Sequence, residues 1–125
     1  MTRWLVDAMN VIGSRPDGWW NDPIKAMHRF AEALDDFAAR TGADVTVVFD
    51  KDPGPLDVTG IEVVVARWKG RNAADHEIEE IVAGSEDPGS LKVVTSDKRL
   101  VEMVTGMGAR VEGAGRFRKV VDRDD

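Results

Sequence analysis

The chain contains no cysteine and only two histidines among its 125 residues. The lack of cysteine excludes disulfide bonds and thiolate metal ligands, and it is typical of proteins in a reducing compartment. No apolar run approaches the roughly 18 residues that a membrane-spanning helix needs, so we expect no membrane segment. The first residues also lack the charged, apolar and small-residue order of a secretory signal. We therefore expect a cytoplasmic protein.

The composition favours one folded domain. Apolar residues make up 42% of the chain, which is enough for a hydrophobic core at this length. We expect a single domain over residues 1–120 and a polar tail over residues 121–125. The net charge of −6 argues against a general nucleic-acid-binding protein, but the charges are unevenly spread along the chain.

Short apolar runs alternate with helical patterns. Continuous β-branched runs such as VTVVF and IEVVVA are typical of strands covered on both faces. The predicted strands are Trp4–Val6, Val45–Phe49, Ile61–Ala66, Leu91–Thr95 and Ala109–Glu112. Helices are predicted to begin at Pro23, after Asp22 as N-cap, and near Asn72 and Ser96. Strands that alternate with helices predict an α/β fold whose central sheet of about five strands is mainly parallel.

Aspartates follow three of the predicted strands. Asp7 follows WLV, Asp50 follows VTVVF and Asp97 follows VVTS, while Asp75 lies in the first turn of the second predicted helix. Ligands of open parallel sheets bind beyond the carboxyl ends of the strands, so we expect these acids to share one edge. Closely spaced carboxylates either take up protons or bind cations, and oxygen ligands suit Mg²⁺ and Mn²⁺. The pattern therefore predicts a site for one or two such ions.

Each acid also has a structural interpretation. Asp97 can stabilise the dipole of a helix that begins near Ser96, and Asp75 can act as a capping-box acid. Asp50 can belong to turn chemistry in the segment DKDPG. Asp7 resists such an explanation, because it stands between apolar residues where burial without a partner is costly.

Four sequence blocks carry a family resemblance: LVDAMNVIG, VVFD, RNAADHEIEEIV and VVTSDKRL. In this order they resemble the signature blocks of NYN-domain ribonucleases, and most closely the YacP-like branch of the PIN-like nuclease superfamily. The resemblance implies a PIN-like three-layer α/β/α fold and a metal-dependent endoribonuclease. It implies a catalytic, metal-binding role for four residues: Asp7, Asp50, Asp75 and Asp97. Asn10 matches the family asparagine and Ser96 a polar position beside the last acid, and both would orient ligands or a phosphate.

Three places depart from the family pattern, and in the first of them Ala8 and Met9 stand where a glycine followed by an aromatic residue is usual. His76 stands where a second acid is common, and Lys51 places a cation directly after Asp50. These departures favour an alternative, a non-catalytic RNA- or ribosome-associated module that keeps the fold. A third hypothesis, a phosphohydrolase of the haloacid-dehalogenase type, rests on the two aspartates of VVFDKD. That type normally carries such a motif on its first strand.

Basic residues gather at two places. Arg67, Lys69 and Arg71 surround Trp68 just before Asp75. The segment GRFRK, residues 115–119, forms a second basic group around an aromatic ring. Cations can hold RNA phosphates and aromatic rings can stack on bases, so both are candidate RNA contacts. The structural alternative is a solvated charged surface with Trp68 packed on the edge of the core.

Further aromatic and histidine residues have two interpretations as well. Trp19 and Trp20 lie after the first predicted strand, where they would stack on bases or, for one of the pair, pack against the first predicted helix. His28 lies beside the apolar stripe of that helix and is expected to be structural. His76 neighbours Asp75 and can titrate near neutral pH.

Overall fold

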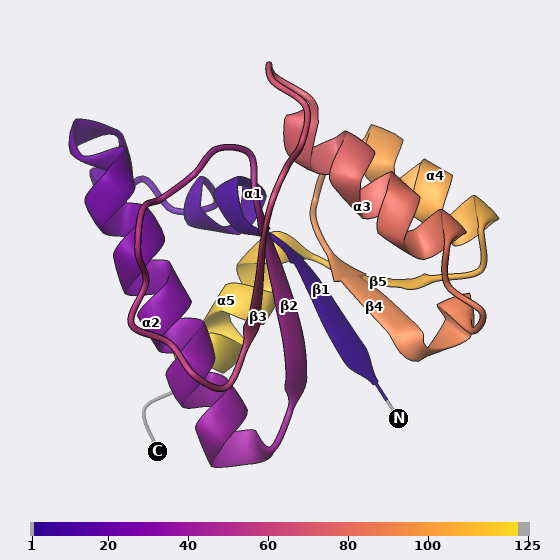
Figure 1. The fold of residues 1–125 in the computed structure, drawn as a ribbon, viewed down its shortest axis with the longest axis horizontal. Coiled ribbons are helices and arrows are strands. Elements are labelled where there is room, and N and C mark those ends of the chain that lie inside the picture. The colour runs from indigo at the N-terminus through magenta and orange to yellow at the C-terminus, as the bar shows by residue number, and fades with distance from the viewer. Residues whose placement is uncertain (1, 123–125) are drawn as a thin grey trace.

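The computed structural model describes residues 2–122. Five strands form one parallel sheet with the order β3-β2-β1-β4-β5 (Figure 1). The strands are β1 (Arg3–Asp7), β2 (Asp44–Phe49), β3 (Glu62–Val65), β4 (Leu91–Val94) and β5 (Arg110–Glu112). The helices are α1 (Ala8–Ile12), α2 (Pro23–Thr41), α3 (Ala73–Ala83), α4 (Lys98–Gly106) and α5 (Ala114–Val121), with short 3₁₀ turns η1 (Trp19–Asn21) and η2 (Pro88–Ser90).

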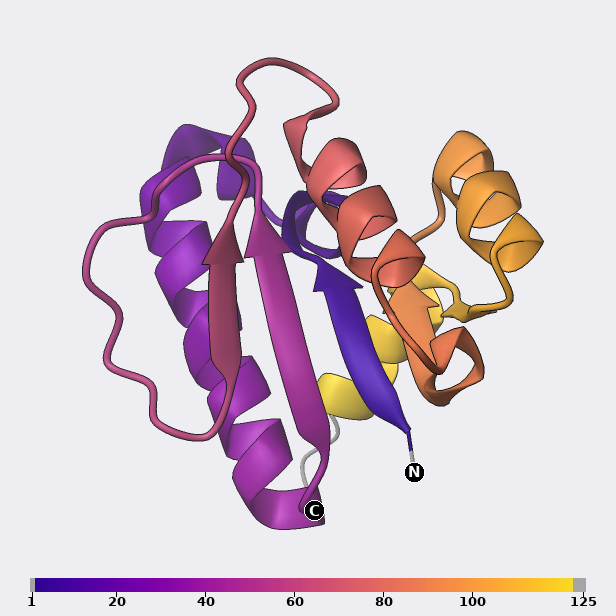
Figure 2. The same ribbon diagram turned by 45° about the vertical axis from the view of Figure 1, so that its right-hand side comes forward.

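Helices cover both faces of the sheet, which confirms the expected three-layer α/β/α architecture. On one face α1, α2 and α5 contact one another, and on the other α3 contacts α4. Figure 2 shows the two helical layers on either side of the strands. Each layer has its own apolar cluster: Phe30, Leu34 and Phe37 of α2 belong to the first, and Ile78 and Leu100 to the second.

Local signals in the sequence set the bounds of α2. The Asp22 carboxylate accepts a hydrogen bond from the backbone N–H of Lys25, and Pro23 occupies the first turn. The helix ends at Gly42, whose φ of 72° is a left-handed conformation that favours glycine. The predicted start and end of this helix are therefore confirmed, and the other predicted elements appear within a few residues of their expected places.

Two helices were not predicted from the sequence. α1 has only five residues, too few to show a helical period. α5 has two glycines nearby and several cations, yet Ala114, Phe117 and Val121 are all buried along one side of it. Because Val121 is buried in α5, this residue does not belong to the expected polar tail of residues 121–125, of which residues 123–125 lie outside the described part.

The connection from β2 to β3 contains no helix, as expected from its sequence. It runs across α2, where the Asp35 carboxylate accepts hydrogen bonds from the backbone N–H groups of Thr59 and Gly60 at 3.2 and 2.6 Å. His28 Nε2 lies 2.7 Å from the carbonyl oxygen of Pro53, so this histidine has the structural role that was predicted.

Within residues 2–122, no helix has both the length and the apolar character needed to cross a membrane.

Candidate active site

Asp7 is the buried centre of the carboxyl edge of the sheet. It ends β1, the central strand, lies opposite Val48 of β2, and is only 5% exposed. The Thr95 hydroxyl donates a hydrogen bond of 3.1 Å to Asp7 Oδ2. The same Thr95 oxygen accepts the backbone N–H of Asp97 at 3.2 Å. Thr95 therefore links the end of β1 to the start of α4.

Asp75 and Asp97 approach this edge from the beginnings of two helices. Asp97 is the N-cap of α4, and its Oδ1 accepts the backbone N–H groups of Arg99 and Leu100. Asp75 lies in the first turn of α3, is 8% exposed, and its Oδ2 lies 3.8 Å from Nη1 of Arg99. Asp97 therefore lies at the N-terminus of the helix as the structural interpretation expected, but Asp97 itself is the cap, and Asn72 makes no side-chain cap for α3.

The three carboxyl groups influence one another electrostatically. The pKa of Asp7 is raised from an ordinary 3.8 to about 7, and burial is the largest cause. The charge of Asp75 and, more weakly, that of Asp97 also raise this pKa. Hydrogen bonds from Thr95 and from the Asn10 backbone lower it. Burial and the charge of Asp97 also raise the pKa of Asp75, while Arg99 opposes this shift. Asp75 and Asp97 therefore lie close enough to Asp7 for their charges to act on it, at the edge where the sequence predicted these acids.

Asp50 lies at the same edge but in a different environment. It directly follows β2, and its Oδ1 is buried without a hydrogen-bond partner among the described residues. Its charge is not among the causes that shift the pKa of Asp7 or Asp75. Asp50 instead lines a cavity of about 540 Å³ together with the residues of the 66–71 loop. The next acid, Asp52, accepts the backbone N–H of Gly54 and so does belong to turn chemistry.

The carboxylate oxygens at this edge are the ligands that a hard divalent cation prefers. Among the described residues, two of the carboxyl groups lack a cationic partner: Asp50 has an unpartnered buried oxygen, and Asp7 has a raised pKa. Within residues 2–122, however, no three acidic or histidine side chains are gathered into a group that could hold a metal ion by themselves.

Asn10 and Ser96 connect three elements beside the acids. Asn10 Oδ1 accepts the backbone N–H of Ser96 at 2.8 Å, and Ser96 Oγ accepts the backbone N–H of Ala114 at 2.9 Å. These bonds hold α1, the β4–α4 turn and α5 together. The structure therefore gives both predicted site residues a positioning role at this edge.

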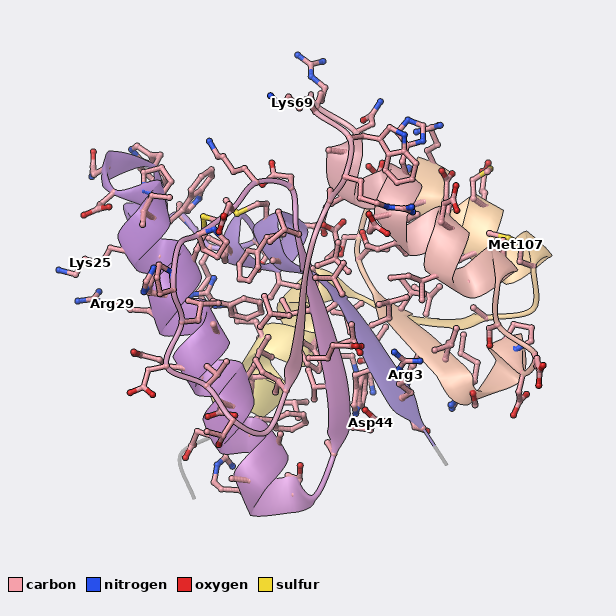
Figure 3. The ribbon with its side chains drawn as sticks, viewed as in Figure 1. Arg3, Lys25, Arg29, Asp44, Lys69 and Met107 are labelled. Carbon is pink, nitrogen blue, oxygen red and sulfur yellow. The ribbon has the colours of Figure 1, made fainter. Side chains whose placement is uncertain are left out.

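The basic loop before α3 is anchored by a buried acid. Glu77, 6% exposed, accepts hydrogen bonds from the backbone N–H and the guanidinium of Arg67 at 3.1 to 3.3 Å. The Arg67 guanidinium also lies 4.7 Å from the centre of the Trp68 ring. Lys69 and Arg71 are exposed and have no ion-pair partner within residues 2–122, and Figure 3 shows Lys69 at the tip of the loop. Arg67 thus anchors the loop, while Lys69 and Arg71 remain available to a ligand.

The sequence interpretation missed Glu77 and Arg99. Glu77 could have been found from helical spacing, because it lies four residues after the small residue Ala73 and next to Ile78, on the face that α3 buries. A buried acid on such a face requires a partner, and the nearest cation in sequence is in the preceding loop. Arg99 carries no comparable signal, since its meeting with Asp75 depends on how α3 and α4 pack.

The aromatic ring of the second basic group is not available to RNA. Phe117 is fully buried, with its ring centre 5.0 Å from that of Trp4 and 5.8 Å from that of Phe37. Arg118 donates to the carbonyl oxygens of Val11 and Ile12. Of the two interpretations of this segment, base stacking by Phe117 is therefore wrong, because the helical period of α5 brings the ring into the core.

The remaining aromatic residues divide as the sequence suggested. Trp19 packs against the apolar cluster of α2, while the neighbouring Trp20 is 54% exposed. His76 is exposed, with Nδ1 3.6 Å from Glu79 Oε2 and its ring 5.6 Å from that of Trp68. It borders the acidic edge without contacting Asp7.

Comparison with known proteins agrees with this arrangement. Residues 4–125 match the family described as the YacP-like NYN domain. The chain belongs to this family. A crystal structure of Rae1 (YacP) from Bacillus subtilis is similar to it, with 28% sequence identity and a TM-score of 0.76 over 96% of this chain and 74% of that one. A W164L mutant of the same protein matches equally well and is covered to 75%. No curated protein matches the chain.

Membership of the YacP-like NYN family supports a nuclease-like, RNA-associated domain. The phosphohydrolase hypothesis gains nothing from these comparisons. It is also weakened by the fold, since the motif VVFDKD ends β2, the second strand of the chain and not the first, and its second aspartate forms a turn.

Proposed function

We propose that this YacP-like NYN domain is a metal-dependent endoribonuclease. The observation that supports it best is Asp7, a carboxyl group buried at the end of the central strand beside Asp75 and Asp97. Collecting acids in this way destabilises the protein on its own, because each ionised group disfavours the others. A divalent cation would offset this cost, and it is the cofactor that the family resemblance implies.

Asp7, Asp75, Asp97 and the neighbouring Asp50 would hold one or two Mg²⁺ or Mn²⁺ ions, with water completing the ligand set. When bound, such an ion supplies an activated water and charge stabilisation for cleavage of an RNA phosphodiester. The chain's own groups position these acids. Thr95 orients Asp7 by its hydrogen bond, and Arg99 lies beside Asp75.

Other residues would act on the RNA. The exposed Lys69 and Arg71 would bind phosphates close to Asp50, in a loop that the Arg67–Glu77 contact keeps in place. Asn10 and Ser96 hold the elements on the far side of the acids together and would orient ligands or a phosphate there.

A second candidate function is a non-catalytic RNA- or ribosome-associated module. It is favoured by Lys51 and His76, which replace or adjoin family acids, and by the lack of a ready metal-binding group within residues 2–122. In that case the basic loop would bind RNA while the acids remained without a catalytic role.

A cleavage assay with a labelled RNA of mixed structure distinguishes the nuclease from the non-catalytic module. We expect cutting with Mn²⁺ or Mg²⁺, none with EDTA, and a loss of at least about 100-fold in Asp97→Asn, in the range that charge-stabilising groups contribute. Asparagine keeps the N-cap oxygen of α4, so this variant removes charge without removing the cap. The matched control is Asp44→Asn, an exposed acid at the opposite end of β2. Binding without metal-dependent cutting would select the second candidate.

A further inference from the structure

A second cavity lies at the end of α1, whose last residue, Ile12, lines it, whereas Asp7 precedes the first residue of that helix. It has a volume of about 380 Å³ and is formed by the η1 turn, the first half of α2 and the end of α5. Apolar groups line part of it, and charged groups the remainder. The residues that matter below are Ile12, Trp19, Lys25, Phe30, Arg29 and Arg118.

The acids of this cavity already have partners. Asp17 Oδ2 lies 3.1 Å from Nη2 of Arg118, and Asp122 Oδ2 lies 2.6 Å from Nη1 of Arg15. Asp22 is used as the N-cap of α2.

Two of its cations, by contrast, have none. Within residues 2–122, Lys25 and Arg29 have no ion-pair partner, and both are exposed. Being four residues apart, they lie one helical turn from each other, and Figure 3 shows them extending from the same flank of α2. The acids and cations that line the cavity balance in number, and the two cations without an ion-pair partner in the described part of the chain lie together on α2, so an anion can bind between them.

The wall of the cavity suits a flat apolar group. Trp19 is half-buried and packs at 6.0 Å between ring centres, edge to face, against the exposed Trp20. Phe30 and Ile12 close the floor. A flat group beside a phosphate is the chemistry of a nucleotide, since bases stack on aromatic rings while cations hold the backbone. The volume lies at the lower end of the range for small-ligand sites and suits one such unit.

The cavity is also a short distance from the acids. Asp7 directly precedes α1, and Ile12, the last residue of that helix, lines the cavity. Five residues of α-helix span about 8 Å. Arg118 donates to the carbonyl oxygens of Val11 and Ile12 at 3.3 and 3.0 Å, which fixes the end of α1 against the cavity.

We propose that this cavity binds one nucleotide of single-stranded RNA, with the base against Trp19 and a phosphate between Lys25 and Arg29. This nucleotide would be next to the part of the same RNA that lies at the acidic edge. This inference rests on the proposed handling of RNA by the domain. It assigns a second contact region in addition to the loop that carries Lys69 and Arg71.

The test is RNA binding without cleavage. A labelled single-stranded oligonucleotide is titrated in EDTA over a series of salt concentrations, with wild type, the double variant Lys25→Gln/Arg29→Gln, and the control Lys119→Gln. Lys119 is an exposed cation of α5 that does not line the cavity. Each phosphate contact contributes about 0.7 to the slope of log affinity against log salt. Because Lys25 and Arg29 would share one phosphate, we expect the double variant to lose about 0.7 of slope and roughly tenfold in affinity, and the control to match wild type.

Photocrosslinking of the wild type tests the position of the base without any change of charge in the protein. An oligonucleotide carrying 5-iodouridine is crosslinked to wild type, and the modified peptide is mapped by mass spectrometry. We expect modification at Trp19, which lines the cavity, and modification at Trp20 alone would count against the proposal. Modification only at Trp68, or an unchanged salt slope in the double variant, would overturn the proposal.

The outcomes separate this proposal from the proposed function. A wild type that cuts RNA while the double variant keeps its slope leaves the nuclease standing and removes this site. A wild type that binds RNA through this site but never cuts it keeps this site and removes the nuclease proposal. Failure of the wild type to bind RNA in EDTA would overturn this site, while the nuclease proposal is judged by cleavage with Mn²⁺ or Mg²⁺.

Discussion

At the scale of single residues, Asp7 combines deep burial with two acidic neighbours. The raised pKa of about 7 means that the folded, metal-free protein holds a proton on this group over a pH range in which the unfolded chain, with a pKa near 3.8, has lost it. The folded state therefore binds more protons in that range, and its stability falls as the pH rises from about 4 to about 7. The raised pKa of Asp75 acts in the same direction.

We predict that the stability of the metal-free wild type decreases between pH 5 and pH 8, and that Asp7→Asn removes much of this decrease. A shift from 3.8 to about 7 corresponds to a loss on the order of 3 kcal/mol over that interval. Urea unfolding in EDTA at both pH values measures it. Asp44→Asn, on the exposed end of β2, should keep the wild-type dependence. A decrease that is equally large in Asp7→Asn would show that Asp7 is not the group responsible.

Residue identity alone predicted that Asp7, Asp75 and Asp97 meet, because the ends of parallel strands and the starts of the following helices lie at one edge. It did not separate Asp50 from them. That separation depends on the 66–71 loop, whose residues share a cavity with Asp50 while Glu77 holds Arg67 in place.

At the scale of elements, α5 changes the interpretation of the last basic segment. Its apolar residues Ala114, Phe117 and Val121 recur at helical spacing, but the intervening glycine and cations gave the segment the look of a solvated surface. The helix contacts α1 and α2, and Arg40 of α2 donates to the carbonyl oxygen of Val121. α5 is thus a structural support for the layer that carries α1.

We predict that Phe117→Ala lowers the free energy of unfolding by about 3–5 kcal/mol, the usual cost of removing a buried aromatic side chain. Urea unfolding measures it, with Lys119→Ala as a control on the exposed side of the same helix, expected within about 0.5 kcal/mol of wild type. If Phe117→Ala instead kept full stability and weakened only RNA binding, the stacking role rejected above would have to be restored.

At the scale of the whole molecule, a net charge of −6 coexists with local cationic regions at Lys69, Arg71, Lys25 and Arg29. The surplus of acids is partly concentrated where the proposed ions would bind. Cation binding at that edge should therefore affect the stability of the entire domain, because a ligand that binds only the folded state stabilises it.

We predict that Mg²⁺ or Mn²⁺ raises the melting temperature of the wild type. At a metal concentration 100 times the dissociation constant the gain is about 2.7 kcal/mol, or roughly 10 °C for a domain of this size. Thermal unfolding with metal and with EDTA measures it. The double variant Asp7→Asn/Asp75→Asn should lose the shift and Asp44→Asn should keep it. Identical melting curves across millimolar metal would contradict the proposed ion site.

The sequence by itself determined the strands, the long helix α2 and the placing of acids at strand ends, because apolar runs, helical periods and caps such as Asp22 and Gly42 act locally. Only the tertiary structure decided which of these residues lie close enough to interact. The order β2-β1-β4 places Asp7 at the centre, the packing of α3 on α4 brings Arg99 to Asp75, and the docking of α5 buries Phe117. These contacts join residues far apart in the chain, and their strength depends on burial that no local pattern specifies.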